Sequence, residues 1–208
     1  MWPSSRRARA LFRSPSPNPI SPGCAPLSGV AAPVAARCNG PSFREAALFT
    51  HRGLSGPAIL QASSYWREGD AIEIDWLPDH AEDVLVTRKR ARPKAQIKTA
   101  LSEVLPARLS EALNADEAIL GDMKDQKLIE IARALKAWRV TPNGTEGYAK
   151  AEVTVGGIDT GALSQQTMEV RAVPGLYFIG EAVDVTGWLG GYNFQWAWAS
   201  GWCAGNAL

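Results

Sequence analysis

The side chains best suited to chemistry lie near the end of the chain, where an apolar run meets a glycine and a carboxylate. Residues 176–179 (Leu-Tyr-Phe-Ile) are wholly apolar and are followed by Gly180 and Glu181. Such a run is typical of a strand buried on both faces in a parallel sheet. Because open α/β sheets bind ligands at the carboxyl ends of their strands, we expect Glu181 to accept hydrogen bonds from ligand hydroxyl groups. Gly180 would let the ligand approach the backbone closely.

A second group of candidates surrounds a pair of glycines. Gly190 and Gly191 precede a segment of helical character that begins at Tyr192. The first N–H groups of a helix have no partner within it, and together with the helix dipole they favour an electron-rich acceptor. The candidate ligand-binding residues here are Asp184, Thr186, Gly190, Gly191, Tyr192 and Asn193. Asp184 and Thr186 either contact the ligand or shape the loop.

Other kinds of chemistry have little support in the sequence. His51 is a candidate proton donor because its ordinary pKa suits acid–base work, but a structural hydrogen bond explains it equally well. The cysteines, Cys24, Cys38 and Cys203, form no CxxC pair, and the chain has only two histidines, so we expect no metal site and no disulfide framework. There is no Walker loop and no defensible Ser-His-Asp arrangement, so the catalytic residues stay unassigned.

Composition describes an ordinary globular protein. The chain has 208 residues, of which 46% are hydrophobic and 21% charged, with a formal net charge of +1. From this balance we expect no nucleic acid and no membrane, whereas the small-molecule substrate expected for this chain is implied by the resemblance described below. The cysteine usage fits a reducing, cytoplasmic location.

The middle of the chain divides into two blocks by pattern. Residues 27–92 read as a β-rich domain, with strands near 31–38, 45–50 and 70–77 and a short helix from Pro57 to Gln61. Residues 93–140 read as a helical domain. An apolar stripe recurs every four residues at Ile97, Leu101, Leu105, Leu109 and Leu113. Pro106 should separate two helices there, and another should run from about Lys124 to Trp138. The basic run 88–92 is read as a solvated linker, or as a contact for phosphates.

Residues 141–208 read as α/β again. Strands are expected at 151–155, 167–170 and 176–179, followed by the helix that begins near Tyr192. The tryptophans crowd into this part of the chain, at Trp188, Trp196, Trp198 and Trp202. Such clusters line interfaces or pockets or fill a core, and core packing is the expectation for them.

Residues 1–26 differ from the rest. They are rich in Arg, Ser and Pro, and the first acidic residue of the chain is Glu45. A segment of this composition cannot bury apolar surface and is expected to be disordered. Two alternatives are a transit peptide and a stretch translated out of frame.

The long motifs resemble one known family. Residues 48–60 (LFTHRGLSGPAIL) and 184–197 (DVTGWLGGYNFQWA) are similar to segments of the BaiN-like, or aminoacetone-oxidase-like, NAD(P)/FAD-dependent oxidoreductases. The resemblance implies an α/β fold, the C-terminal part of a Rossmann-type flavoprotein with two dinucleotide-binding domains. It also implies an inserted β-barrel-like domain (27–92, partial), a small helical domain (93–140) and hydride transfer through FAD, with NAD(P)H as a possible electron donor. Residues 141–208 would then be the C-terminal part of the FAD-binding domain, with the electron-rich flavin edge at the 190–191 helix start.

The chain departs from this family in one respect. No GxGxxG occurs in residues 1–208, although that motif holds the FAD pyrophosphate in the family. We therefore expect very weak FAD binding, or none, by this chain alone. Two alternatives to an active oxidoreductase are an inactive truncated or frameshifted fragment, and a subunit that needs a separately encoded N-terminal half.

Overall fold

The computed structural model describes residues 7–8, 12–13, 25–113, 118–147 and 151–208. The chain divides into two compact units: unit 1 is Met1–Ala10 with Glu146–Leu208, and unit 2 is Leu11–Thr145. Most of the segment 1–26, predicted to be disordered or out of frame, lies outside the described residues, so that prediction stays untested.

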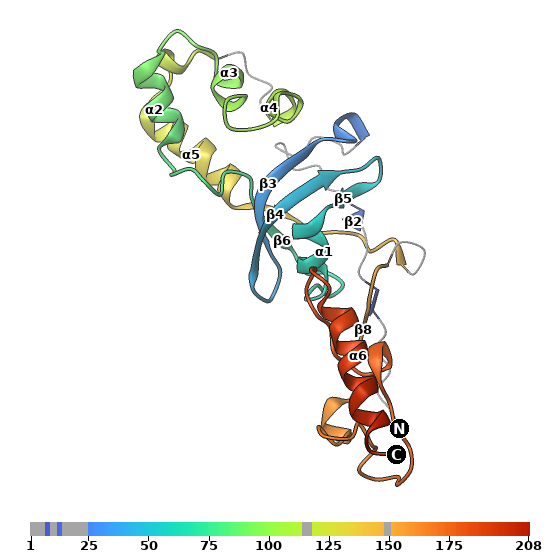
Figure 1. Ribbon diagram of the computed structural model, residues 1–208. Helices are drawn as coiled ribbons and strands as arrows, with labels where there is room; N and C mark the ends of the chain where they lie inside the picture. Colours follow the sequence, from blue (N-terminus) through green and yellow to red (C-terminus); the bar gives the residue numbers. More distant parts are fainter. Residues whose placement is uncertain (1–6, 9–11, 14–24, 114–117, 148–150) are drawn as a thin grey trace. The chain divides into compact units, whose positions relative to one another are not determined.

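Unit 2 is built on a curled antiparallel half-barrel sheet of six strands, in the order β2-β5-β4-β3-β6-β7 (Figure 1). Its strands are β2 Phe12–Arg13, β3 Ala31–Arg37, β4 Ser42–Phe49, β5 Gly53–Ser55, β6 Ile72–Asp75 and β7 Trp138–Val140. The predicted strands near 31–38, 45–50 and 70–77 correspond to β3, β4 and β6.

The strands form where apolar and polar residues alternate. In β6, Ile72 and Ile74 are buried while Glu73 and Asp75 are partly exposed, which confirms the period-two pattern. Helix α1, Pro57–Ser63, packs on β3 and β4 and begins with proline at its first turn, as predicted. Gly56 precedes it with φ 92°. A side chain there would lie 2.7 Å from the Ala46 carbonyl oxygen, so the turn requires glycine.

Four further helices of unit 2 are described: α2 Val84–Ala91, α3 Ile97–Leu101, α4 Ala107–Leu113 and α5 Asp125–Lys136, with a 3-10 turn η2 at Leu120–Asp122. Two of them, α3 and α4, carry the predicted stripe. The first four members of the stripe are buried, and Pro106 separates α3 from α4 as expected. These helices and the sheet share one continuous hydrophobic core.

Two predictions for the helical block are wrong. Helix α5 ends at Lys136, and Trp138 instead pairs with Ile74 in strand β7, where its ring packs edge-on against Trp76 at 5.7 Å. The basic run 88–92 is not a linker, because it forms the end of α2 and the residue after it. Ion pairs tie it to its neighbours: Arg88 and Arg92 contact Glu103, and Lys89 contacts Asp125.

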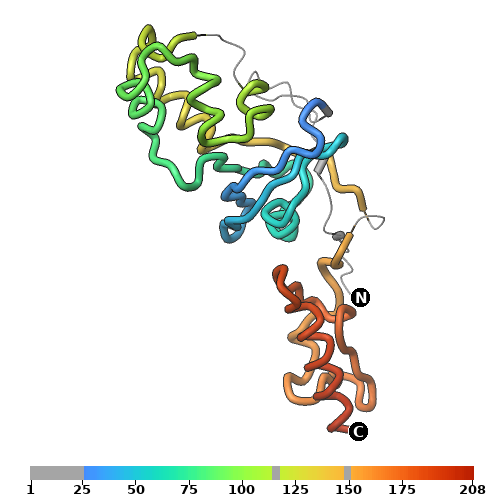
Figure 2. The backbone as a smooth tube through the Cα atoms, turned by 45° about the horizontal axis from the view of Figure 1, so that its top comes forward, coloured from blue at the N-terminus to red at the C-terminus, as the bar shows by residue number. Residues whose placement is uncertain are grey.

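The described residues of unit 1 form little regular structure apart from helix α6, Tyr192–Gly205 (Figure 2). Strand β1, Arg7–Ala8, pairs with β8, Thr154–Val155, in an antiparallel ladder. The 3-10 turns η4, Thr160–Ala162, and η5, Gly180–Ala182, precede this helix. The buried centre of this unit is small: Leu163, Val170 and Val183, with four partly buried neighbours. The expectation that the tryptophan cluster fills a core is met only by the half-buried Trp196.

The strands predicted at 167–170 and 176–179 are not formed. The two segments meet in one isolated bridge, Glu169 with Tyr177, and Val170 makes a second isolated bridge with Leu163. Within the described part of unit 1, residues 168–170 pair with 176–178 through the Glu169–Tyr177 bridge alone, and the pairing does not extend into a ladder. Leu176 and Ile179 are consequently 38% and 44% exposed, not buried on both faces. The parallel sheet expected for 141–208 is thus not formed by the described residues.

No helix among the described residues is long and apolar enough to cross a membrane. Within those same residues, no three His, Cys, Asp or Glu side chains gather where they could hold a metal ion.

Candidate functional site

Gly180 is fixed against helix α6 by two side chains from successive turns of that helix. Its N–H donates to the Ser200 hydroxyl at 2.9 Å, and its carbonyl accepts from the Trp196 indole N–H at 3.0 Å. Gly180 has φ 60°, a conformation that favours glycine. The residue therefore opens a turn, η5, and does not end a buried strand as predicted.

The two carboxylates of the motif bind backbone groups from a distant part of the chain. Glu181 Oε1 accepts from the N–H of Thr154 at 2.6 Å, and Asp184 Oδ1 accepts from the N–H of Gly156 at 3.1 Å. A short parallel bridge between Ile158 and Val183 strengthens the same seam. Each carboxylate thus uses one oxygen to hold β8 and the residues after it, and both side chains are exposed on their other side.

Asn193 closes the loop that leads into α6. Its side-chain oxygen accepts from the Gly187 N–H at 2.7 Å, and its side-chain nitrogen donates to the Gly187 carbonyl at 3.1 Å. The loop is tight here, because a Cβ on Gly187 would lie 2.8 Å from Tyr192 Cβ. Thr186, half-buried, lies just before this closed loop.

Helix α6 begins where the glycine pair predicted. Gly191 is its N-cap, in the left-handed conformation with φ 88°, and Gly190 has φ 116°. The N–H groups of the first turn, Tyr192 to Phe194, have no acceptor within the helix, since the first helical bond runs from Gln195 N–H to the Gly191 carbonyl. No charged residue follows Asp184 in the chain, so the first turn of α6 carries no carboxylate of its own.

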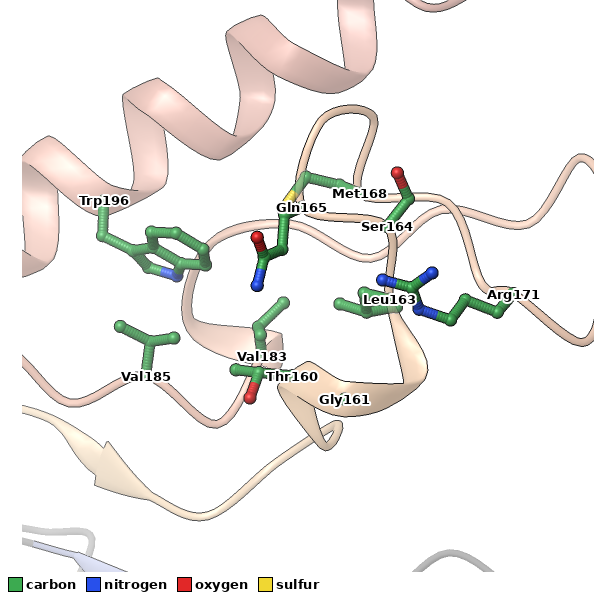
Figure 3. Close-up of a pocket in the computed structure, with 10 residues that line it drawn as sticks. All are labelled: Thr160, Gly161, Leu163, Ser164, Gln165, Met168, Arg171, Val183, Val185 and Trp196. Carbon is green, nitrogen blue, oxygen red and sulfur yellow. The ribbon is translucent and has the colours of Figure 1, made fainter.

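A cavity of about 380 Å³ lies beside this motif in unit 1 (Figure 3). Trp196 of α6 lies at one end and Arg171 at the other, and Val183 and Val185 lie on either side of Asp184 in sequence. The remaining lining residues are Thr160, Gly161, Leu163, Ser164, Gln165 and Met168. The cavity is mostly apolar with a few polar groups and one cation, the usual character of a small-molecule pocket.

The structure places the predicted ligand-binding residues in two neighbouring parts of unit 1. Gly180 contacts α6, and Glu181 and Asp184 contact the 154–156 segment, whereas Gly190, Gly191, Tyr192 and Asn193 lie at the start of α6. His51 is not among them: it is exposed in the turn between β4 and β5 of unit 2. Residues not predicted are Gly187, Ser200 and Arg171. The first could have been suspected as part of the glycine-rich loop, but Ser200 and Arg171 carry no sequence signal.

The sequence from residue 21 to residue 153 matches the family model described as HI0933-like protein barrel and H2TH domain. The match covers more than half of the chain, so the protein belongs to the HI0933-like family. The curled sheet and the helices of unit 2 account for most of the matched region.

Three curated relatives are similar to this chain. The ribosomal RNA dihydrouridine synthase of Escherichia coli is 53% identical over 192 residues, covering 88% of this chain and 47% of its own length. The protein of the same name from Haemophilus influenzae is 49% identical over 187 residues, covering 86% and 46%. The 3-dehydro-bile acid delta(4,6)-reductase of Clostridium scindens is 32% identical over 173 residues, covering 76% and 42%. The chain thus spans about half the length of the curated relatives it matches.

The prediction that nucleic acid is no partner is wrong. Two of these relatives are named as ribosomal RNA dihydrouridine synthases, a name that implies an RNA substrate for them. The prediction rested on a net charge of +1, which sums over the whole chain and does not report where basic side chains gather.

Proposed function

We propose that this chain is part of a flavin-dependent reductase that saturates a carbon–carbon double bond conjugated to a carbonyl group, with a uracil base of ribosomal RNA as its substrate. The observation that carries the proposal is the 53% identity to the Escherichia coli ribosomal RNA dihydrouridine synthase over 192 residues. The oxidoreductase class agrees with the resemblance of residues 48–60 and 184–197 to NAD(P)/FAD-dependent enzymes.

The names of the relatives share one kind of chemistry. Converting uridine to dihydrouridine saturates the C5–C6 bond, which is conjugated to the C4 carbonyl. Reducing the 4,6 double bonds of a 3-dehydro bile acid saturates bonds conjugated to the C3 carbonyl. In both, hydride adds to a carbon conjugated with the carbonyl and a proton adds to the neighbouring carbon. Two substrates of very different shape therefore undergo the same type of reaction, the reduction of a double bond conjugated to a carbonyl group.

The donors at the start of α6 fit the edge of a flavin. A reduced flavin carries negative charge at its N1/C2=O edge, and free N–H groups at a helix N-terminus stabilise such a group. When bound, the flavin supplies the hydride. This chain's residues hold and orient it: the first turn of α6 presents the donors, and Asn193 keeps the loop before them closed. The proposed flavin-binding residues are Gly180, Glu181, Asp184, Thr186, Gly190, Gly191, Tyr192 and Asn193.

The pyrophosphate end of FAD needs donors that residues 1–208 do not carry, since GxGxxG is absent from them. In our proposal, residues 141–208 are the C-terminal part of an FAD-binding domain, while 27–92 and 93–140 are its β-barrel-like and helical insertions. The remainder of the cofactor site belongs to a polypeptide equivalent to the half of the relatives that this chain does not match. A reduced nicotinamide is the proposed electron donor.

An absorbance spectrum tests the cofactor assignment. The chain is purified alone and together with the unmatched part of the Escherichia coli relative, each with added FAD and then gel-filtered. We expect flavin bands to travel with the protein only in the second sample. A colourless, folded complex would refute the flavin proposal and favour the inactive-fragment alternative, and a yellow chain alone would show that the site needs no second half.

A further inference from the structure

The end of helix α2 and the segment that follows it are strongly basic. Residues 84–102 contain six lysines and arginines and no acidic residue, although the whole chain has 22 basic and 21 acidic residues. Five of the six are close together in sequence, from the last turn of α2 to just beyond its C-cap. We call these five residues the α2 basic end: Arg88, Lys89, Arg90, Arg92 and Lys94. The near-neutral charge of the whole chain therefore hides a local excess of positive charge.

Two carboxylates neutralise part of this charge. Glu103 contacts Arg88 at 3.0 Å with one oxygen and Arg92 with the other. Asp125 accepts a hydrogen bond from Lys89 at 2.8 Å, and this bond, together with the charges of Lys89 and Arg90, holds the pKa of Asp125 below its usual range. Within the described part of the chain, Lys94 makes no ion pair. Five positive charges thus face two negative ones.

The backbone under these side chains is held in place. The N–H of Leu120 donates to the Ala95 carbonyl at 2.9 Å, and the N–H of Gly121 donates to the Pro93 carbonyl at 2.7 Å. These bonds fix the segment after α2 to the turn η2, while α2 itself lies beside α5 (Figure 1). Side chains on a fixed backbone lose less conformational freedom on binding than side chains on a mobile loop.

Helix stability explains part of the basic end, but not all of it. Cations in the last turn of a helix are favourable against its negative end, and the effect falls off within that turn. Lys89 has a further structural role, because its ammonium group donates to the Met123 carbonyl at 2.6 Å. Arg92 is the C-cap and Lys94 lies beyond the helix, so the dipole does not account for them. Together with Arg90 they are exposed and can meet an external anion.

Another pair of arginines in unit 2 is less suited to this role. Arg37 and Arg139 each donate both Nε and Nη2 to the carboxylate of Glu73. All three side chains line the same polar cavity of about 340 Å³. An anion that entered this cavity would compete with Glu73 for both guanidinium groups, so the α2 basic end is the better surface for an anion.

We propose that the α2 basic end binds RNA, with Arg90, Arg92 and Lys94 in contact with its phosphates. This assignment rests on the proposed function, in which ribosomal RNA is the substrate and therefore the polyanion that the surface meets. Contacts to phosphates fix the position of a nucleic acid but carry no sequence information. The α2 basic end would therefore hold the RNA, and the choice of uracil would be made elsewhere in the enzyme.

The test is the salt dependence of RNA binding by the 208-residue chain, measured by fluorescence anisotropy with a labelled single-stranded fragment of ribosomal RNA. Each phosphate contact contributes about 0.7 to the slope of the logarithm of affinity against the logarithm of salt concentration. The triple variant Arg90→Gln/Arg92→Gln/Lys94→Gln should therefore reduce the slope by about 2 and weaken binding on the order of a hundredfold at about 0.1 M salt. The matched control, Arg44→Gln/Arg67→Gln/Arg133→Gln, removes the same charge from other exposed positions of unit 2 and should leave both values close to wild type.

Two outcomes would overturn the assignment. Equal losses in the two triple variants would show that only net charge matters, and a wild-type chain that does not bind the RNA, or binds it as tightly as the basic-end variant does, would remove the surface. Circular dichroism checks that the variants fold. If the basic-end variant does not, Lys94→Gln decides alone, because it breaks no ion pair among the described residues. It should reduce the slope by about 0.7, and an unchanged slope would refute the contact.

Binding is measured without flavin and without turnover, so the two proposals can fail separately. A chain that binds RNA through the α2 basic end, but reduces no uridine when complemented with the unmatched half of the Escherichia coli relative, would refute the proposed function and leave the surface standing. A complemented basic-end variant that reduces ribosomal RNA as well as the wild type does would refute the surface alone.

Discussion

Replacing Asn193 with alanine should weaken flavin binding without unfolding the protein. The substitution removes both hydrogen bonds that close the loop, from Gly187 N–H at 2.7 Å and to the Gly187 carbonyl at 3.1 Å. A typical hydrogen bond contributes about 1 kcal/mol net, and the half-buried loop lets water replace part of the loss. A net loss of about 1.4 kcal/mol corresponds to a roughly tenfold higher dissociation constant for FAD.

The assay is titration of FAD, followed by flavin fluorescence, into the chain complexed with the complementing half. Asn206→Ala is the matched control, because Asn206 lies at the other end of α6 and donates a single bond to the Trp202 carbonyl at 2.8 Å. We expect its affinity to change less than twofold by the same reasoning. Equal affinities for wild type and Asn193→Ala would refute the role of the closed loop, and equal losses in both variants would show a general effect on the helix.

Three further predictions concern unit 2. Gly69→Ala should lower the free energy of unfolding by about 1–2 kcal/mol, because alanine is strained in the left-handed conformation. Gly56→Ala should lower it by more, because the added Cβ would also lie 2.7 Å from a backbone atom. Urea unfolding measures both variants, and equal losses would contradict the effect of the clash. Burial by itself would raise the pKa of Glu73, but hydrogen bonds from Arg139 and Arg37 outweigh it and hold that pKa below its usual range. The stability that ionised Glu73 contributes is therefore present above its unfolded-state pKa and lost as the pH falls through the folded-state pKa. Glu73→Gln should lower the free energy of unfolding at neutral pH, and the urea midpoint of the variant should fall less steeply than that of the wild type as the pH is lowered. Burial and then the Asp70 carboxylate raise the pKa of Cys38 to about 11, so at mildly alkaline pH iodoacetamide should label it only after unfolding, as peptide mapping would report.

The regular part of unit 2 could be predicted because its signals are local. The alternation of apolar and polar residues in β6 and the apolar residues at every fourth position through Leu109 each define one apolar face, which is buried in the core. Helix α2 carries no such periodic signal and is not predicted. Its buried residues, Val84, Leu85 and Val86, are consecutive in sequence and show no helical period. Trp138 was assigned to the wrong element because its position continues the apolar face of α5, and only the pairing with Ile74 decides otherwise.

The candidate site could be predicted in part. The glycine pair located the start of α6, because left-handed backbone and a free helix end are properties of the local sequence. The backbone groups bound by Glu181 and Asp184 lie 27 and 28 residues earlier in the sequence. The local sequence around the motif cannot predict these contacts, because the fold brings the two segments together. The run 176–179 has the composition of an interior strand, but an interior strand needs a ladder with its neighbours, and the described residues supply only an isolated bridge from Glu169 to Tyr177.

The most direct test of the central claim is the dihydrouridine content of ribosomal RNA, measured by mass spectrometry of its nucleosides. The host is an Escherichia coli strain that lacks its ribosomal RNA dihydrouridine synthase, supplied with this chain joined to the unmatched part of that protein. Our account predicts that dihydrouridine returns to the ribosomal RNA. A folded, flavin-loaded chimera that leaves the uridine unreduced would contradict it.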